Sequence, residues 1–271
     1  MRAVVTRPGA LWLLVLSFAL GGCLADLRPA KLRGRAPSPA EVESGRELLE
    51  ALVEEHGGAR RRAHLGAVEA VIRDEWRGLI GWFSNPWPDA RNHLQLRYAP
   101  EGGWAEVRFL AGSRADETWG RDQRGGWERA PGGERVARES RSRQFILAAY
   151  PYLFELPFRL NEAPLVFDAG QAEHEGHTYD RVLVTWGEFE PHADHDQYLL
   201  WIDRESDRLS VAEYTIRDKA RFATGADHFD DYRWIEGIAV PFVHTISMSA
   251  WQRDFVHRVE FESVRYRGTP P

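Results

Sequence analysis

The sequence is almost free of two residue types, cysteine and lysine. Cys23 is the only cysteine among 271 residues, so no intramolecular disulfide can form. The fold must therefore depend on its hydrophobic core, and a chain of this length can bury enough surface for one. Only Lys31 and Lys219 are lysines, and arginine supplies the other cations. The formal net charge of −6 argues against the basic surface that nucleic acid requires, and we expect no nucleic-acid partner.

The short motifs of several enzyme classes are also missing. The sequence contains no Gly-x-Ser-x-Gly elbow, no phosphate-binding loop and no Gly-x-Gly-x-x-Gly fingerprint. His174-Glu-Gly-His177 is one residue short of the helical zinc motif His-Glu-x-x-His, and its glycine favours a hairpin turn. No nucleophile, base and orienting group come together, so we expect no catalytic residues, no cofactor and no enzyme.

Two clusters of histidine and aspartate are candidate functional sites by residue type. His192, Asp194, His195 and Asp196 are candidate zinc ligands by residue type. On an extended loop, however, ligands two and three residues apart point in different directions, and we predict a solvated polar loop without a metal. The second cluster precedes a predicted strand, and we expect it to face water; it consists of Asp227, His228, Asp230 and Asp231.

The first 23 residues have the order of an export signal. Arg2 and Arg7 form a positive leader, residues 10–19 are apolar, and small residues then precede Cys23. The apolar stretch is shorter than the roughly 20 residues that span a bilayer. Leu20-Gly21-Gly22-Cys23 resembles a bacterial lipobox, which implies cleavage before Cys23 and lipidation of that cysteine. The alternative is an ordinary cleaved signal with an incidental cysteine.

The remaining chain divides into a tether and one domain. After the signal peptide (1–22), residues 23–37 contain prolines, glycine and scattered arginines without an apolar period, which predicts an extended, mobile tether. Residues 38–271 form the predicted domain. Its first helix should start at Ser38, because Pro39 and Glu41 complete a capping box, and Gly57-Gly58 should end it. A second short helical turn is expected over 59–65.

Most of the domain shows the period-two alternation of strands. Apolar and polar residues alternate from residue 68 onward, with glycines at Gly125-Gly126 and Gly237 marking tight turns. This pattern predicts an antiparallel sheet or barrel of about ten strands. The expected strands are 68–73, 93–98, 104–110, 117–119, 178–186, 197–203, 209–217, 229–235, 239–247 and 255–266.

The order of these segments resembles a known superfamily. The residues that carry the likeness are the helix end His56-Gly57-Gly58 and the segments LFELPFRL (153–160), YDRVLVTW (179–186), DQYLLWID (196–203) and YRWIEGIAVP (232–241). Together they are similar to the lipoprotein-carrier superfamily, and within it to an uncharacterised branch of bacterial lipoproteins. The resemblance covers about residues 40–265. It implies a mainly β (α+β) fold: a curved antiparallel half-barrel whose open side is closed by helices, with acyl chains as the ligands of its better-known members.

The most apolar segment of the domain is the candidate lid of such a half-barrel. Residues 142–150 have helical composition, Pro151 should end or kink the helix, and the residues that follow alternate loosely. Laid over the concave face, this segment would line an apolar site. The alternative is that it only fills the barrel, as side chains fill most small barrels. The candidate ligand-binding residues are Phe145, Tyr150, Tyr152, Phe154, Leu156 and Phe158.

These observations lead to one functional expectation and two alternatives. We expect a monomeric lipoprotein of the bacterial envelope that is held to a membrane through lipidated Cys23 and binds a lipid or lipoprotein acyl chain. Leu24 follows the cysteine where an aspartate often marks inner-membrane retention, so the resemblance favours the outer membrane, facing the periplasm. The first alternative is a structural or protein-interaction lipoprotein with a filled barrel, and the second is a metal-dependent enzyme.

Overall fold

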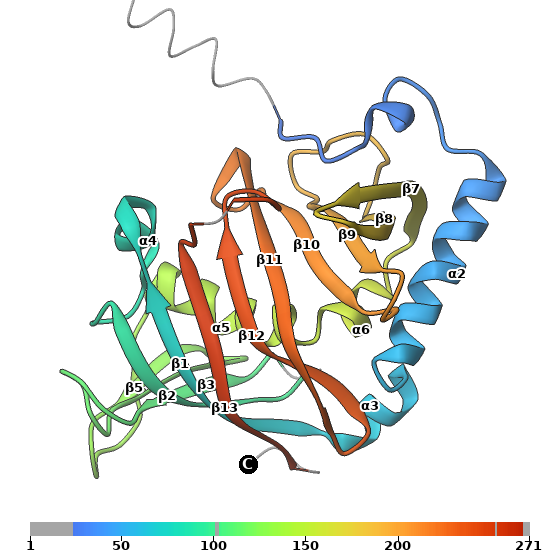
Figure 1. The fold of residues 1–271 in the computed structure, drawn as a ribbon. Helices are drawn as coiled ribbons and strands as arrows, with labels where there is room; N and C mark the ends of the chain where they lie inside the picture. Colours follow the sequence, from blue (N-terminus) through green and yellow to red (C-terminus); the bar gives the residue numbers. More distant parts are fainter. Residues whose placement is uncertain (1–23, 101–102, 253, 268–271) are drawn as a thin grey trace, which may run out of the picture.

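A single antiparallel sheet, open at both edges, organises the protein (Figure 1). The computed structural model describes residues 24–100, 103–252 and 254–267. Within these residues the sheet has 13 strands in the spatial order β6-β5-β4-β3-β2-β1-β13-β12-β11-β10-β9-β8-β7. The strands are β1 (Ala67–Trp76), β2 (Arg91–Tyr98), β3 (Ala105–Phe109), β4 (Thr118–Asp122), β5 (Gly125–Arg129), β6 (Val136–Ala137), β7 (Leu165–His174), β8 (His177–Thr185), β9 (Gln197–Asp203), β10 (Leu209–Ile216), β11 (Ala220–Ile235), β12 (Ile238–Ser247) and β13 (His257–Arg267).

The chain builds this sheet as two meanders that meet in its middle. Strands β1 to β6 run outward to one edge, and β7 to β13 return from the other edge. The last strand, β13, pairs with the first, β1, and places Trp76 opposite His257. The predicted mainly β, half-barrel fold is confirmed, with 13 strands rather than about ten. His174 and His177 pair across the β7–β8 turn, which confirms the predicted hairpin.

The first helices also follow the sequence prediction. Helix α2 (Pro39–Glu55) starts at the predicted capping box, in which Ser38 accepts from the Glu41 backbone and the Glu41 carboxylate accepts from the Ser38 backbone. Helix α3 (Ala59–Leu65) is the expected second turn. Helix α2 lies against the edge strand β7 so closely that a Cβ on Gly45 would stand 2.5 Å from the Asp168 nitrogen. This contact covers an edge that could otherwise pair with another chain.

The topology explains why two helices close the concave face. Strands β6 and β7 are consecutive in the sequence but lie at opposite edges of the sheet. The connection between them must therefore cross the whole sheet, and it does so as α5 (Arg141–Phe154) and α6 (Leu156–Leu160). The sheet curves around these helices, as Figure 1 shows. We call α5 and α6 together the lid.

Two apolar clusters fill the space between the lid and the sheet. Ile146, Leu147 and Tyr150 of α5 pack on inward side chains of β1–β3, β12 and β13. Leu156 and Leu160 of α6 pack with α2 and with inward side chains of β7–β11. The alternating residues of each strand thus point toward the lid, as the period-two pattern predicts.

The tether prediction is wrong for residues 24–37. Leu32, at the end of a single 3₁₀ turn (η1, Ala30–Leu32), is completely buried in a third cluster with Phe167, Leu183 and Leu199. These three side chains lie on the opposite face of β7–β9, away from the lid. Because that face is apolar as well, it needs a cover, and the segment after Cys23 provides it. Cys23 itself and the signal peptide lie outside the described residues.

Two further elements, a helix and a strand, differ from the sequence prediction. Helix α4 (Gly78–Ser84), between β1 and β2, was not predicted. Strand β11 begins at Ala220, nine residues earlier than expected, so that Asp227 and His228 lie inside the strand. The expectation that this cluster faces water is therefore wrong for Asp227, which is completely buried, although Asp230 and Asp231 are exposed.

Candidate functional site

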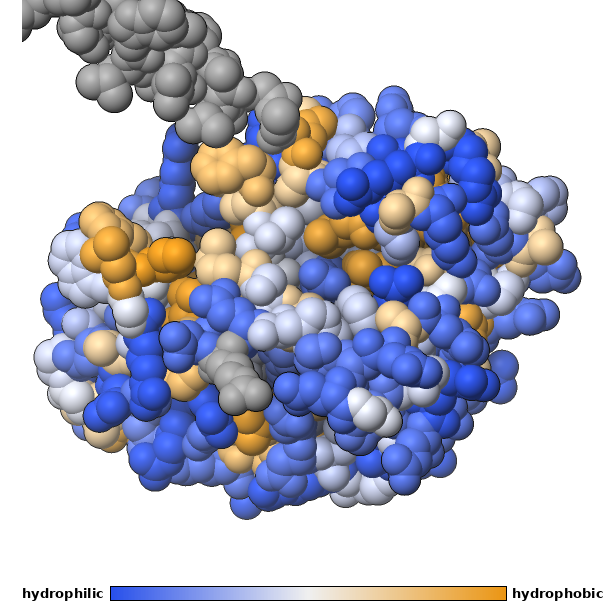
Figure 2. Space-filling view, turned by 45° about the horizontal axis from the view of Figure 1, so that its top comes forward, coloured by the Kyte–Doolittle hydropathy of each residue, from blue (hydrophilic) through white to orange (hydrophobic). Residues whose placement is uncertain are grey.

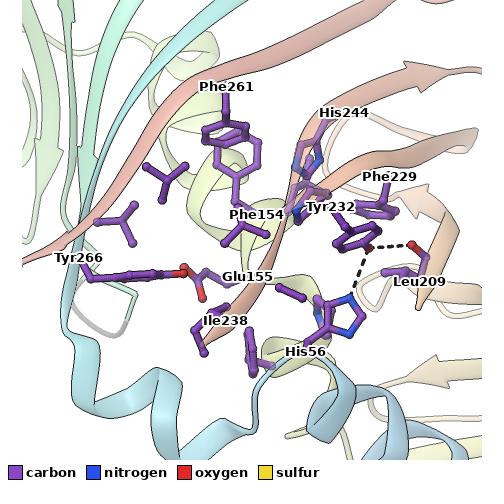
Figure 3. Close-up of a pocket in the computed structure, with 18 of the residues that line it drawn as sticks. His56, Phe154, Glu155, Leu209, Phe229, Tyr232, Ile238, His244, Phe261 and Tyr266 are labelled. Carbon is purple, nitrogen blue, oxygen red and sulfur yellow. Dashed lines mark hydrogen bonds between the residues drawn. The ribbon is translucent and has the colours of Figure 1, made fainter. Parts of the chain in front are cut away.

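A small cavity lies where α5 ends and α6 begins, between the lid and the concave face of the sheet (Figure 3). Its volume is about 20 Å³, which leaves room for about one water molecule and none for an acyl chain. Its wall is mostly apolar and aromatic. The residues that line it are His56, Val68, Tyr98, Leu153, Phe154, Glu155, Pro157, Phe158, Leu209, Phe229, Tyr232, Ile238, Ala239, Val240, Pro241, His244, Phe261, Val264 and Tyr266.

Two of the six predicted ligand-binding residues line this cavity, namely Phe154 and Phe158. Tyr150 and Leu156 are fully buried core residues instead, one in each of the two lid clusters. Tyr152 packs against Tyr198 in the cluster under α6. The remaining predicted residue, Phe145, is partly exposed at the start of α5 and does not line the cavity.

The helix boundary accounts for this redistribution. Helix α5 continues through Pro151 to Phe154, whereas the sequence prediction confined it mainly to residues 142–150. A proline inside a helix removes one backbone hydrogen bond, and here only one turn follows it. Because the helix continues, Phe154 lies four residues after Tyr150 on the same face and stacks on it at 5.3 Å. Tyr152 therefore points to the other half of the sheet.

The break in the lid is held by a buried ion pair. Glu155, between α5 and α6, accepts hydrogen bonds from Arg62 Nε at 2.5 Å and Arg62 Nη2 at 2.6 Å. The Tyr98 hydroxyl donates to the same carboxylate at 2.8 Å. Burial works against the charge on Arg62, but the hydrogen bonds to Glu155 raise its pKa above the ordinary value. The pair thus ties the lid to α3 and β2.

A second buried polar pair lies in the wall of the sheet. His244 Nδ1 lies 2.9 Å from Asp227 Oδ2, and both side chains are completely buried. The other imidazole nitrogen, Nε2, has no hydrogen-bond partner in the part of the chain that the structure describes. His244 lines the cavity, where Phe154 and Phe229 flank its ring at 4.8 Å and 5.1 Å. A buried polar atom without a partner costs about 1–3 kcal/mol. Among the described residues, Asp227 Oδ1 of the same pair also has no hydrogen-bond partner.

His56 and Tyr232 add polar groups at the other side of the cavity. His56 Nδ1 donates to the Leu52 carbonyl at 2.8 Å, and Nε2 lies 3.3 Å from the Tyr232 hydroxyl. That hydroxyl donates to the Leu209 carbonyl at 2.7 Å, as the dashed lines in Figure 3 show. Burial lowers the pKa of His56 to about 4, so this histidine is neutral at pH 7.

A third cluster of polar side chains lies deeper, under α5. Asp74 Oδ2 lies 2.9 Å from His257 Nε2 and accepts from the Tyr150 hydroxyl, which in turn accepts from Trp87 Nε1 at 3.3 Å. Burial and then the Asp74 charge raise the pKa of Tyr150 well above its ordinary value. These residues do not line the cavity, and they fix α5 to β1 and β13.

The sequence reasoning missed the polar residues of the cavity wall. The sequence pattern indicates only a helix end at His56 and only an apolar segment around Glu155. Two features of the sequence indicate buried polar groups. One is Glu155, a single acid within the apolar run Leu153 to Leu160, and the other is His244, at a position where the alternation of β12 requires an inward side chain. Neither signal shows which partner, Arg62 or Asp227, lies opposite.

The predicted metal candidates lie in the loop between β8 and β9. The rings of His192 and His195 are 4.9 Å apart, and the Asp194 backbone nitrogen donates to His192 Nδ1. Within residues 24–100, 103–252 and 254–267 no group of three or more histidine, cysteine, aspartate or glutamate side chains is arranged to hold a metal ion.

Comparison with known proteins identifies the fold. A DUF1329 family protein from Desulfovibrio piger matches with a TM-score of 0.52 and 12% sequence identity, covering 83% of this chain and 93% of that chain. A domain assigned as an outer membrane lipoprotein-sorting protein, from Vibrio parahaemolyticus, matches with a TM-score of 0.50 and 10% identity over the same shares. A LolA superfamily protein from Nitrosomonas europaea has a TM-score of 0.49 and 14% identity, covering 83% and 94%.

The first two of these likenesses confirm the predicted resemblance at the level of the fold. No protein-family model and no curated protein matches the sequence. A shared fold can host many functions, so it does not by itself identify a ligand. None of the helices in the described part of the chain is long and apolar enough to cross a membrane.

Proposed function

We propose, from the premise that this chain has the lipoprotein-carrier fold, that it binds an apolar ligand with one hydrogen-bonding group beneath its lid. The Nε2 atom of His244 carries this proposal, because it is a buried polar atom in a mostly apolar cavity wall and has no hydrogen-bond partner among the described residues. The polar group of a lipid or acyl chain would satisfy Nε2, while the chain contacts Phe154 and Phe261. The pairing of His244 with Asp227 holds the ring in place for that contact.

Binding requires the lid to move. The cavity of about 20 Å³ cannot hold an acyl chain while the lid is closed, so α5 and α6 must shift outward. The break at Glu155 divides the lid into two short helices, and a ligand that enters there separates α6 from the sheet.

We further propose that the protein works as a lipoprotein of the bacterial envelope. The lipobox-like sequence Leu20-Gly21-Gly22-Cys23 supports lipidation of Cys23, and Leu24 favours the outer membrane. An acyl anchor suits a chain whose described helices include none that crosses a bilayer. Two or more acyl chains anchor a protein stably, whereas one chain gives only marginal binding.

One observation favours a second candidate, a structural or protein-interaction lipoprotein. The concave side is almost filled, because the side chains of the lid occupy it. In that case the polar groups beneath the lid fix its position, and nothing enters. The two candidates differ in whether the lid opens and a ligand is retained.

The test is native mass spectrometry of the protein purified from its own membrane. We expect a co-purified lipid in the native chain and none in the double variant Asp227→Leu/His244→Phe. This variant removes both polar partners at once, so neither is left buried without the other, and the domain should stay folded. The control is His93→Phe on β2, at a position that alternation places on the face away from the lid. A native chain that never carries lipid nor takes up a fluorescent fatty acid favours the filled barrel.

A further inference from the structure

Helix α4 presents its large side chains to solvent. Its sequence, from Gly78 to Ser84, contains no charged residue. Leu79, Trp82 and Phe83 are 72%, 71% and 72% exposed, and Ile80 is also largely exposed. Helices at the surface of a globular protein normally turn such residues inward. Four exposed apolar side chains on one short helix therefore need an explanation outside the core.

The packing of α4 shows that this exposure is built into the fold. The helix contacts the domain through Gly81, where a Cβ would stand 2.7 Å from the Val256 carbonyl oxygen. The Arg77 backbone nitrogen donates to the same oxygen at 2.9 Å, just before the helix begins. Because the glycine side of α4 is the packed side, its bulky residues must point away from the sheet. The rings of Trp82 and Phe83 pack edge to face on each other, with centroids 4.7 Å apart.

The strand register places a further exposed aromatic residue at the same end of the sheet. The last residue of β1, Trp76, pairs with the start of β13, and the end of β12 pairs with the start of β11 at Ser247 and Ala226. The α4 turn, the β12–β13 loop and the β10–β11 turn therefore lie at one end. Phe222 in β11 is 70% exposed at this end. Trp251 in the β12–β13 loop packs instead on the outer face of the sheet, where its ring stacks on that of His174 at 3.5 Å.

We call this group of residues the apolar rim, defined as Leu79, Ile80, Trp82, Phe83 and Phe222. Figure 2, in which the top of Figure 1 comes forward, shows apolar surface at the α4 lobe and again beside the start of the described chain. Exposed cations accompany the rim, because Arg77 precedes α4 and both Lys219 and Arg221 lie beside Phe222.

The start of the described chain is attached to this end. The Ala25 backbone nitrogen donates to the Arg221 carbonyl at 3.0 Å, and the Arg217 guanidinium donates to the Ala25 carbonyl at 2.6 Å. Ala25 follows Cys23 by two residues, and two residues extend over at most roughly 7 Å. The chain length thus limits an acyl group on Cys23 to the neighbourhood of Ala25, which pairs with Arg221 beside Phe222. This step rests on the proposed lipidation.

We propose that the apolar rim inserts into the interface of the lipid bilayer that holds the anchor. Tryptophan and phenylalanine are favoured at the headgroup level, and apolar side chains of surface-bound helices enter the headgroup and acyl boundary. Lys219 and Arg221 beside Phe222 suit lipid phosphates, whereas Arg77 is paired with Glu75 at 2.8 Å. In this orientation the strands point at the membrane, and the start of α5 faces it too, because the Lys219 ammonium lies 4.2 Å from the centre of the Phe145 ring.

The test uses tryptophan quenching in vesicles of phosphatidylcholine brominated on the acyl chain. The full chain is purified from its membrane and reconstituted, and its fluorescence is compared with that in vesicles of unbrominated lipid. We expect Trp82→Phe to lose a distinct part of the quenching. The matched control is Trp234→Phe, because Trp234 is exposed in β11 but pairs with Ala239 at the opposite end of the sheet. That change should leave the quenched fraction as it is in the native chain.

A second variant separates insertion from mere proximity. Leu79→Glu with Phe83→Glu alters only exposed positions, so the domain should stay folded, and it should abolish the quenching of Trp82. Equal quenching in the native chain and in Trp82→Phe overturns the proposal. So does a Leu79→Glu/Phe83→Glu variant that turns a detergent-stable dimer into a monomer, because a second copy then covers the rim.

A failure of the rim to insert can be distinguished from a failure of the proposed lipid anchor. The mass of the same purified chain reports whether Cys23 carries lipid. A chain without lipid is added to vesicles from outside and assayed by the same quenching comparison. Loss of the anchor thus contradicts the lipoprotein assignment, and unquenched Trp82 contradicts the rim.

Discussion

The buried ion pair between Arg62 and Glu155 gives the sharpest test of how the lid is held. The two side chains are each only 5% exposed and form two short hydrogen bonds, with the Tyr98 hydroxyl as a third donor to the carboxylate. Replacing Glu155 with leucine leaves the Arg62 guanidinium buried without its counter-charge. Removal of one partner from a buried pair destabilises proteins by about 3–5 kcal/mol. We expect a loss of this size in the free energy of unfolding.

The matched variant removes both charges at once. Arg62→Met with Glu155→Leu should recover most of the stability, because apolar residues of similar volume often replace a buried pair without loss. Urea unfolding followed by circular dichroism measures both variants. Hydrogen exchange should show the effect of Glu155→Leu concentrated in the amides of α5 and α6. A single variant that loses less than about 1 kcal/mol, or a double variant as unstable as the single one, refutes the idea that this pair secures the lid.

Other predictions address the anchor, acid stability, packing and metal binding. Cys23→Ser should release the protein from the membrane fraction or leave the precursor uncleaved, which fractionation and precursor mass detect. Because burial lowers the pKa of His56 to about 4, the unfolded chain binds a proton that the folded chain does not. Stability should therefore fall by up to about 3 kcal/mol as the pH drops from about 6.5 to 4, and His56→Gln should remove this part of the fall in urea titrations at each pH. Phe154→Ala should destabilise the domain by about 3 kcal/mol in urea, since Phe154 packs on Tyr150 and Phe261, and a loss below 1 kcal/mol would indicate a site that already tolerates empty space. No stoichiometric zinc should survive dialysis, and zinc that is lost on His192→Ala/His195→Ala would contradict this.

The period-two pattern was sufficient to predict most of the sheet. It identified β9 at its observed bounds and the other long strands to within a few residues, except for β7 and the first half of β11. The capping box at Ser38 likewise fixed the start of α2. These features are local, because a strand repeat and a helix cap depend only on neighbouring residues.

The errors arise where long-range contacts decide. Residues 24–37 looked like a tether because they lack a period, yet Leu32 is buried under strands β7 to β9. A signal was available in β9, whose run Tyr198 to Ile202 is apolar at every position, as expected of a strand covered on both faces. The pattern could not show that the preceding segment provides that cover.

The candidate site shows the same limit. The sequence located the lid correctly, but the side chains that reach the cavity depend on whether the helix passes Pro151, which is a question of about one hydrogen bond. The polar partner of the lid, Arg62, comes from α3 and is separated from Glu155 by 93 residues in sequence. Helix α4 was not predicted, because sequence patterns assume that apolar residues are buried, whereas those of α4 are exposed.

The pairing of β1 with β13 also determines when this protein can finish folding. Trp76 and His257 are opposite each other in the middle of the sheet, although nearly the whole domain separates them in sequence. Each meander can form from neighbouring hairpins, but the ladder that unites them requires the last strand. Such a high contact order predicts slow folding. Until residues 257–267 become available, the inward edges of β1 and β12 stay unpaired, so the late-synthesised end of the chain protects the protein from aggregation.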